Sequence, residues 1–223
     1  MKKMKLSTKI LFISLVVLII LLGVFVWPGK LINKIAQKFS KKQQQSATAL
    51  LDDASSKMGN DKYSEAKPIL EKLVKEYPDN FTTWINLGIC YLSSKELSSA
   101  AASFTKATQI DPKSPSAHLL LGNTQRDLGN NEAAIENYKK TLELNKKEMN
   151  AYINLASLYF SQKKYDEAIS LLRQAKLELP NVLQIRYMLA SYYKNLGQTA
   201  NYKVEVSEIL AINPNDKWAK SNR

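Results

Sequence analysis

The pattern of hydrophobic and polar residues divides the chain into two parts. Residues 10–27 form an apolar run of 18 residues, of which 15 are Leu, Ile, Val or Phe and none is charged. At about 1.5 Å per residue, a helix of this length spans about 27 Å, which is close to the hydrocarbon thickness of a bilayer. The run predicts a single N-terminal transmembrane helix, preceded by a short basic tail at residues 1–9.

Two other interpretations of the apolar run fit less well. A cleaved signal peptide has a shorter apolar region that ends in small residues at the cleavage site, whereas this run ends in Val24, Phe25, Val26, Trp27 and Pro28. A helix buried in a soluble core would have a polar face, which the run lacks. We therefore expect an uncleaved, single-pass membrane anchor.

Residues 28–46 are basic and amphipathic. Pro28 and Gly29 end the apolar run, and beyond them apolar residues recur at helical spacing among lysines, at Leu31, Ile32, Ile35 and Phe39. This pattern predicts either a short helix in the lipid headgroup region or an extension of the anchor, and both interpretations stay open. The polar residues 40–46 are typical of a flexible tether.

From Ala47 onward the pattern repeats every 34 residues. Its clearest marker is a proline close to the end of a unit, at Pro78, Pro112, Pro180 and Pro214, with Lys146 in the one slot that lacks it. Such a period predicts stacked units rather than one closed core. Five units are expected, at residues 47–80, 81–114, 115–148, 149–182 and 183–216, followed by a C-terminal tail at 217–223.

The second unit shows which repeat this is. It carries a series of marker residues at fixed spacing, namely Trp84, Leu87, Gly88, Tyr91, Ala100, Phe104, Ala107 and Pro112. This series resembles the tetratricopeptide repeat (TPR) family over about three quarters of the chain, in a membrane-anchored form of bacterial type. The resemblance implies an all-α fold, a right-handed α-solenoid of about five helical hairpins that follows the single transmembrane helix.

Two positions of each unit carry small residues, as the crossing of two helices in a hairpin requires. The eighth position holds Ala54, Gly88, Gly122, Ala156 and Ala190, and the twentieth holds Ala66, Ala100, Ala134 and Ala168. Tyr202 occupies the twentieth position of the fifth unit, which leaves the angle of that hairpin open. Gly129 and Gly197 are predicted to end first helices with a positive φ.

The C-terminal tail is too short for a complete capping helix. We therefore expect three apolar residues of the last hairpin to stay partly exposed, namely Val206, Ile209 and Leu210.

The charge distribution bears on the kind of partner. The net charge is +12, and residues 1–46 supply nine lysines without any acidic residue, whereas residues 47–223 hold 23 Lys and Arg against 20 Asp and Glu. A nucleic-acid-binding domain carries its positive charge on the folded surface. Here the charge lies beside the apolar run, so we expect contact with anionic lipid and no nucleic-acid partner.

The residues that commonly carry chemistry are few. Cys90 and His118 are the only cysteine and the only histidine, and both lie at positions where a packing role is expected. The chain has no glycine-rich phosphate loop, no HExxH helix and no paired-cysteine zinc pattern. We expect no enzyme activity, no cofactor, no metal site and no small-molecule substrate.

The resemblance to TPR proteins also implies a binding site. In that family a concave groove is lined by positions 2, 5, 9, 12 and 13 of the first helices. The residues expected to contact a protein or peptide partner are Ile85, Ile89, Leu119, Asn123, Arg126, Ile153, Asn154, Phe160, Tyr187 and Lys194. Asn123 and Asn154 are expected to bind a partner's backbone. The cations with which chaperone-binding relatives hold an acidic tail are absent, so such a tail is disfavoured.

The sequence therefore predicts a membrane-anchored scaffold for protein interactions, in an envelope, secretion, pilus or chaperone-linked complex. The alternative is a structural membrane protein that self-associates through its last hairpin or its transmembrane helix. Lysines flank the apolar run on both sides and do not decide its orientation. A short basic tail is hard to translocate, which favours a cytoplasmic N-terminus with the repeats outside.

Overall fold

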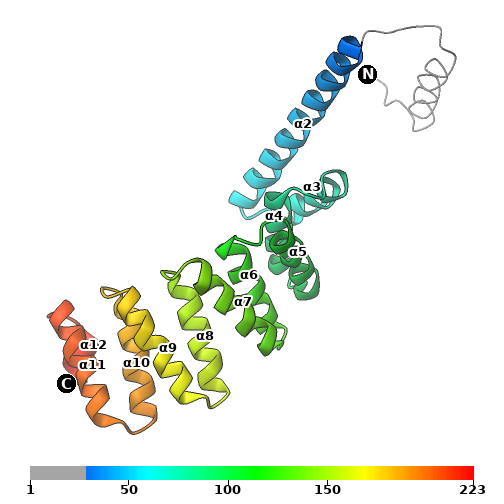
Figure 1. Cartoon of the computed structure of the whole chain (residues 1–223). Helices are drawn as coiled ribbons and strands as arrows, with labels where there is room; N and C mark the ends of the chain where they lie inside the picture. Colours follow the sequence, from blue (N-terminus) through cyan, green and yellow to red (C-terminus); the bar gives the residue numbers. More distant parts are fainter. Residues whose placement is uncertain (1–28) are drawn as a thin grey trace. The chain divides into compact units, whose positions relative to one another are not determined.

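The computed structural model describes residues 29–223, with side chains described from residue 33. This range contains eleven helices, α2 to α12, and no strand, so the prediction of an all-α fold is confirmed for it (Figure 1). The basic tail at 1–9 and the predicted transmembrane helix at 10–27 lie outside the described residues. Within residues 29–223, no helix combines the length and the apolar character that a membrane span needs. The chain divides at residue 50 into two compact parts, a division distinct from that into 34-residue units.

Helix α2 runs without a break over Gly29–Gly59, where the sequence suggested a short helix and a tether. The reason is that no Gly or Pro occurs from residue 30 to residue 58, and Lys, Gln, Ala and Leu favour helix. All residues from 33 to 46 are exposed, including Phe39, at 71% exposure. The last turns of α2 are the first helix of the first hairpin, in which Ala54 is fully buried.

The helices that follow α2 are α3 (Tyr63–Glu76), α4 (Phe81–Ser93), α5 (Leu97–Ile110), α6 (Pro115–Asp127), α7 (Asn131–Leu144), α8 (Met149–Ser161), α9 (Tyr165–Glu178), α10 (Leu183–Asn195), α11 (Thr199–Ile212) and the short α12 (Lys217–Ser221). Helices α4 to α11 form four successive antiparallel pairs, one in each of the second to fifth predicted units, and α3 follows the end of α2 in the first unit (Figure 1). In each hairpin the helix with the lower number is the first helix.

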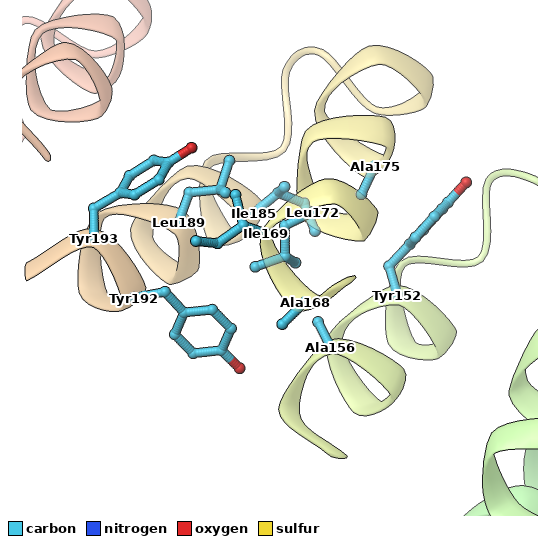
Figure 2. Packing of buried hydrophobic residues seen from close by; sticks show 10 residues of the cluster. All are labelled: Tyr152, Ala156, Ala168, Ile169, Leu172, Ala175, Ile185, Leu189, Tyr192 and Tyr193. Atoms are coloured by element: carbon cyan, nitrogen blue, oxygen red, sulfur yellow. The ribbon is translucent and has the colours of Figure 1, made fainter. Parts of the chain in front are cut away.

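The small residues are buried at the contact between the two helices of a hairpin. Ala156 in α8 and Ala168 in α9 are fully buried in one core cluster and lie next to each other in Figure 2. The alanines at position 20 of the first three units are fully buried as well, at Ala66, Ala100 and Ala134. The expectation that these positions carry the close helix contact is confirmed.

The structure also shows which side chain needs the space at position 8. A Cβ atom added to Gly88 would lie 2.5 Å from the ring of Phe104, and one added to Gly122 would lie 2.8 Å from the ring of Tyr138. Both rings are fully buried and stand at position 24 of their unit. In the units with alanine at position 8, position 24 is aliphatic instead, at Leu70, Leu172 and Val206. Glycine therefore pairs with an aromatic ring, and alanine pairs with a smaller side chain.

The turn inside every hairpin uses a positive φ at position 15. Gly129 and Gly197 adopt φ values of 79° and 69°, as predicted for residues that end first helices. The same position has a φ of 59° or 60° in the other three units, although its residues are Asp61, Lys95 and Lys163. The turn geometry is therefore common to all five hairpins, and only two of them carry the residue that adopts it most readily.

A side chain at position 4 holds the loop between units. Trp84 Nε1 donates to the carbonyl of Pro78 over 2.7 Å, and Arg186 Nη1 donates to the carbonyl of Pro180 over 2.6 Å. His118 Nε2 makes the same bond to Pro112 over 3.1 Å. His118 therefore has a structural role in which it holds the loop by a hydrogen bond, in addition to the packing role that the sequence indicated.

Helix α12 covers the last hairpin. Val206 and Ile209 are 1% and 0% exposed and form a core cluster with Ala219 of α12, so the expectation that they stay partly exposed was wrong. Leu210 is half-buried against the same cluster. The Tyr202 hydroxyl donates to Asn222 Oδ1 over 2.9 Å, just beyond α12, and α10 still packs against α11 with Ala190 fully buried.

Ion pairs join successive units. Lys67 Nζ lies 2.7 Å from Glu96 Oε1, and Lys176 Nζ lies 2.8 Å from Glu205 Oε1 and 3.0 Å from Glu208 Oε2. Burial raises the pKa of Glu205, whose Oε2 has no hydrogen-bond partner. Burial acts to lower the pKa of Lys176, but its hydrogen bonds to Glu205 and Glu208 outweigh that effect and raise it. In these pairs, a lysine of one unit bonds a carboxylate of the next.

The pairing of positions 8 and 24 is testable at Gly88. Gly88→Ala is expected to lower the free energy of unfolding by about 1–3 kcal/mol, because the new methyl group overpacks against the Phe104 ring. Gly88→Ala/Phe104→Leu should recover most of that loss, because it recreates the Ala and Leu pair of the fourth unit. Urea unfolding of both variants and of Phe104→Leu alone measures the coupling between the two sites. A Gly88→Ala variant more stable than the wild type would contradict this account.

Candidate protein-binding face

The ten predicted partner-binding residues all lie on first helices. They are distributed over α4 (Ile85, Ile89), α6 (Leu119, Asn123, Arg126), α8 (Ile153, Asn154, Phe160) and α10 (Tyr187, Lys194). Lys194 is exposed and the other nine are half-buried. We call the surface formed by these ten residues the first-helix face.

The two asparagines of this face are bonded to each other. Asn154 Nδ2 donates to Asn123 Oδ1 over 2.7 Å, and the Tyr138 hydroxyl donates to the same oxygen over 2.9 Å. Burial raises the pKa of Tyr138 to about 12, so its hydroxyl keeps the proton that it donates. Asn123 Nδ2 and Asn154 Oδ1 make no hydrogen bond within the described residues. The pair therefore retains one donor group and one acceptor for a ligand, instead of two whole amides.

The same two positions, position 9 of one unit and position 6 of the next, also lie together at the two preceding junctions. Asn86 Nδ2, at position 6 of the second unit, donates to Ser55 Oγ, at position 9 of the first unit, over 3.3 Å. At the next junction both positions are apolar, and Ile89 and Leu120 pack against one core cluster. Polar and apolar contacts thus alternate along the first helices from the first unit to the fourth.

The aliphatic residues of the face are anchored in the core below it. Ile85 and Ile89 pack against the cluster around Phe104, and Leu119 packs against the cluster around Tyr138. Ile153 packs against the cluster formed between α8, α9 and α10, whose buried residues are shown in Figure 2. Their half-buried side chains leave part of an apolar surface accessible on either side of the bonded asparagines.

Phe160 has mainly a packing contact. Its ring stacks on Tyr192 with centroids 3.9 Å apart and meets Tyr165 edge-on at 4.9 Å. Tyr192 belongs to the next unit, so Phe160 joins the fourth and fifth units. The part of the Phe160 ring that a partner could contact is therefore smaller than the sequence suggested.

Three further charged or polar residues of the first-helix face already have partners, namely Arg126, Tyr187 and Lys194. Arg126 donates from Nε and Nη2 to Asp127 Oδ1, over 3.1 and 2.9 Å, so its charge is compensated by its neighbour. The Tyr187 hydroxyl donates to Asp216. Lys194 lies over the ring of Tyr202, with Nζ 5.6 Å from the ring centroid.

Three surface cavities lie elsewhere. One of about 570 Å³ is lined by His118 and residues of α7, and one of about 450 Å³ by Tyr159 and residues of α9. The third, of about 520 Å³, has Trp84 and Leu87 among its lining residues. None of the ten predicted residues lines any of these cavities. These three cavities therefore do not coincide with the first-helix face.

Trp218 was missed by the sequence analysis. It stands on α12, is 38% exposed and meets Tyr187 edge-on at 5.2 Å. If the 34-residue register is continued past residue 216, Trp218 falls at position 2, one of the positions that line the groove in TPR proteins. Continuing the register was the signal that would have found it.

The described residues give no support for catalytic or metal chemistry. Within residues 29–223 no group of three His, Cys, Asp or Glu side chains is placed to hold a metal ion. Cys90 is fully buried, and burial raises the pKa of its thiol, which opposes formation of the reactive thiolate.

These hairpins define a TPR protein with a protein-interaction fold, as the sequence predicted. Residues 33–187 match the family model described as the cytochrome c-type biogenesis protein H TPR domain, and the chain belongs to that family.

Solved structures show the same fold. A crystal structure of MamA matches with a TM-score of 0.70 and 22% identity, over 77% of this chain and 93% of that one. YrrB, described as a TPR protein with an unusual peptide-binding site, matches with a TM-score of 0.65 and 16% identity, over 83% of this chain and 96% of that one.

Relatives by sequence are much longer proteins. The mitochondrial import receptor subunit TOM70 of Rattus norvegicus is 32% identical over 98 residues, which is 44% of this chain and 15% of that protein. The chain spans about a fifth or less of the length of the first curated relatives that it matches. The similarity therefore concerns the repeats.

The bonded asparagines are testable by mutation. Asn123→Ala is expected to cost about 1–3 kcal/mol of unfolding free energy, because it leaves the Tyr138 hydroxyl and Asn154 Nδ2 without an acceptor. Asn154→Ala should cost less, since Asn123 Oδ1 still accepts from Tyr138. Adding Tyr138→Phe to Asn123→Ala should restore part of the loss. Equal costs for the two alanine variants, measured by urea unfolding, would argue against this shared acceptor.

Proposed function

We propose that this protein is a membrane-anchored scaffold that holds an extended or helical segment of a partner protein on its first-helix face. The observation that carries the proposal is the Asn123 and Asn154 pair, which offers one donor group and one acceptor. A peptide group in an extended segment, or at the end of a helical one, likewise presents a free N–H or C=O, so a partner's backbone can satisfy the pair. The aliphatic residues Ile89, Leu119 and Ile153 flank the pair and would contact side chains of the segment.

The known relatives support an interaction role. The family description names a biogenesis protein, and YrrB is described as having a peptide-binding site. Both descriptions are compatible with a subunit that brings other proteins together in an assembly. We propose that this assembly belongs to the cell envelope, as an envelope, secretion, pilus or chaperone-linked complex, because of the predicted anchor.

The membrane part of the proposal rests on the sequence before the repeats. Residues 10–27 have the length and apolar character of a span, and lysines follow at 30, 34, 38, 41 and 42. Exposed lysines near a bilayer are attracted to anionic headgroups, and the exposed Ile35 and Phe39 can enter the interface. We propose a cytoplasmic N-terminus with the repeats on the other side.

Self-association through the last hairpin is the alternative function. The argument for it was the expected exposure of Val206 and Ile209, and α12 buries both. The exposed apolar surface that favoured this alternative is therefore buried. Self-association through the transmembrane helix is unaffected by this finding.

Bulky charge on the first-helix face should block the partner. Ser157 and Ser191 are exposed at position 9 of the fourth and fifth units, the position that Ile89 and Asn123 occupy on the first-helix face. Ser157→Arg/Ser191→Arg is expected to reduce partner recovery at least about tenfold, because the arginine side chains would displace the few contacts that dominate such interfaces. The matched control is Ser64→Arg/Ser207→Arg, which adds the same charge on exposed second-helix positions. Affinity purification from solubilised native membranes with quantitative mass spectrometry measures recovery. Similar recovery for both double variants would refute binding at this face.

Anchoring and orientation can be measured with one added cysteine. Cys90 is buried and should not react in the folded protein, whereas Ser64→Cys places a thiol at an exposed position. A membrane-impermeant maleimide is expected to label Ser64→Cys, and not the wild type, in intact spheroplasts. Removal of residues 1–28 should release the protein into the soluble fraction. Labelling that requires membrane disruption would reverse the orientation, and a full-length protein that is soluble without processing would exclude the anchor.

A further inference from the structure

Helix α12 begins a sixth copy of the repeat pattern. The Asp216 side chain accepts from the Ala219 N–H over 2.9 Å, as Asn80 and Ser114 do at the starts of α4 and α6. Ala219 is fully buried, like Ala117 at the equivalent third position. The first turn of α12 therefore docks on α10 and α11 as the first helix of a further hairpin would.

Trp218 is the large side chain that this docking leaves accessible. It lies edge-on to Tyr187 at 5.2 Å and to Tyr202 at 6.5 Å, and it stays 38% exposed. The hydroxyls of both tyrosines are used internally, by Asp216 and Asn222. The indole N–H of Trp218 has no hydrogen-bond acceptor among the described residues. An exposed ring held between two other rings, with a free donor, is typical of an interface anchor.

The hydrogen-bond acceptors near Trp218 are already occupied. Asp216 accepts from Tyr187 and Ala219, and Asn222 Oδ1 accepts from Tyr202 over 2.9 Å and from Lys194 over 3.5 Å. Lys217 and Lys220 stand on α12 with Trp218, and Lys203 follows Tyr202 in α11. None of these three lysines forms an ion pair within the described part of the chain, and Lys220 Nζ donates to Asn215 Oδ1 over 3.1 Å. The surface thus presents N–H donors and positive charge, a combination that a carboxylate complements.

An ion pair in the first unit shows which kind of group binds a lysine at the position of Lys203. Lys203 stands at position 21 of its unit, which is the position of Lys67 in the first unit. Lys67 reaches forward to Glu96 of the next unit over 2.7 Å and lies over the ring of Tyr91 in that unit. By this equivalence, Lys203 faces the side on which a following unit would supply an acidic partner.

We infer that the end of the repeats formed by Lys203, Lys217, Trp218 and Lys220, which we call the end face, docks an acidic protein segment that places an apolar side chain against Trp218. The occupant is a different protein rather than a second copy, because two end faces would bring like charges together. The inference does not rest on the proposed function, although the end face adjoins the first-helix face through the contact between Trp218 and Tyr187.

A synthetic peptide tests the end face with the full-length protein in a neutral detergent. The probe is a fluorescein-labelled peptide of about twelve residues with about six glutamates around a central Leu-Phe pair, and its analogue has Gln in place of Glu. Fluorescence anisotropy should show binding of the acidic peptide that weakens as salt is raised from about 50 to about 300 mM. The Gln analogue should bind at least about tenfold more weakly.

Two matched triple variants separate the end face from general charge attraction. Lys203→Gln/Lys217→Gln/Lys220→Gln should weaken binding at least about tenfold, whereas Lys113→Gln/Lys146→Gln/Lys147→Gln, at exposed positions in loops between units, should change it less than about threefold. Trp218→Ala should weaken it at least about fivefold. Ile85→Ala/Ile89→Ala should leave it unchanged, which keeps this result separate from the first-helix face.

Four results would overturn the inference. Equal weakening by both triple variants would mean that the peptide is attracted to the basic chain as a whole. No binding at about 1 mM peptide would exclude an acidic segment as the occupant. A dimer in light scattering that dissociates in the Lys203→Gln/Lys217→Gln/Lys220→Gln variant would assign the end face to a second copy. Binding of phosphatidylglycerol vesicles in place of the peptide, weakened by the same triple variant, would assign the end face to lipid.

Discussion

Phe104 and Tyr138 are fully buried in the space that a missing Cβ atom leaves on the opposite helix. Because interiors are packed as densely as crystals, an added methyl group at Gly88 or Gly122 would have to displace the ring or the helix. The spacing of the two helices in a hairpin is therefore set by a pair of side chains. The positions of the first helices, and of every residue on the first-helix face, depend on that spacing.

The binding that we propose for the first-helix face uses only those groups that the fold does not already engage. Asn123 supports Tyr138 and Asn154 before it supports any ligand, Arg126 is compensated by Asp127, and Phe160 joins two units. What remains is one amide donor group, one amide acceptor and the flanks of half-buried aliphatic residues. Such a surface suits a polypeptide backbone with apolar side chains, and it offers little to a strongly charged ligand.

The period of 34 residues was sufficient to predict the hairpins, because small residues, prolines and glycines recur at positions where backbone geometry admits few alternatives. It did not predict that Lys95 and Lys163 adopt the positive φ of Gly129, because lysine carries no sign of that conformation in sequence. The role of Asn123 was also missed. Its acceptor is shared across two units, and such contacts between units depend on the stacking rather than on any local pattern.

The ends of the repeat region were harder to predict than its middle. Helix α2 continues through residues 40–46, because polarity alone does not distinguish a tether from an exposed helix with good helix formers. Helix α12 is only five residues long, yet it buries Val206 and Ile209 through one alanine. A short segment in the correct register can cover a hydrophobic core that its length alone would not suggest.

The match between positions 8 and 24 also limits how such an array can evolve. A recombination that joined the first helix of the second unit to the second helix of the fourth would place Gly88 opposite Leu172 and leave a void. The reciprocal product would place Ala156 opposite Phe104 and create a clash. Whole hairpins can therefore be duplicated or exchanged between genes, whereas a single helix can be exchanged only between units that carry the same combination of residues at positions 8 and 24.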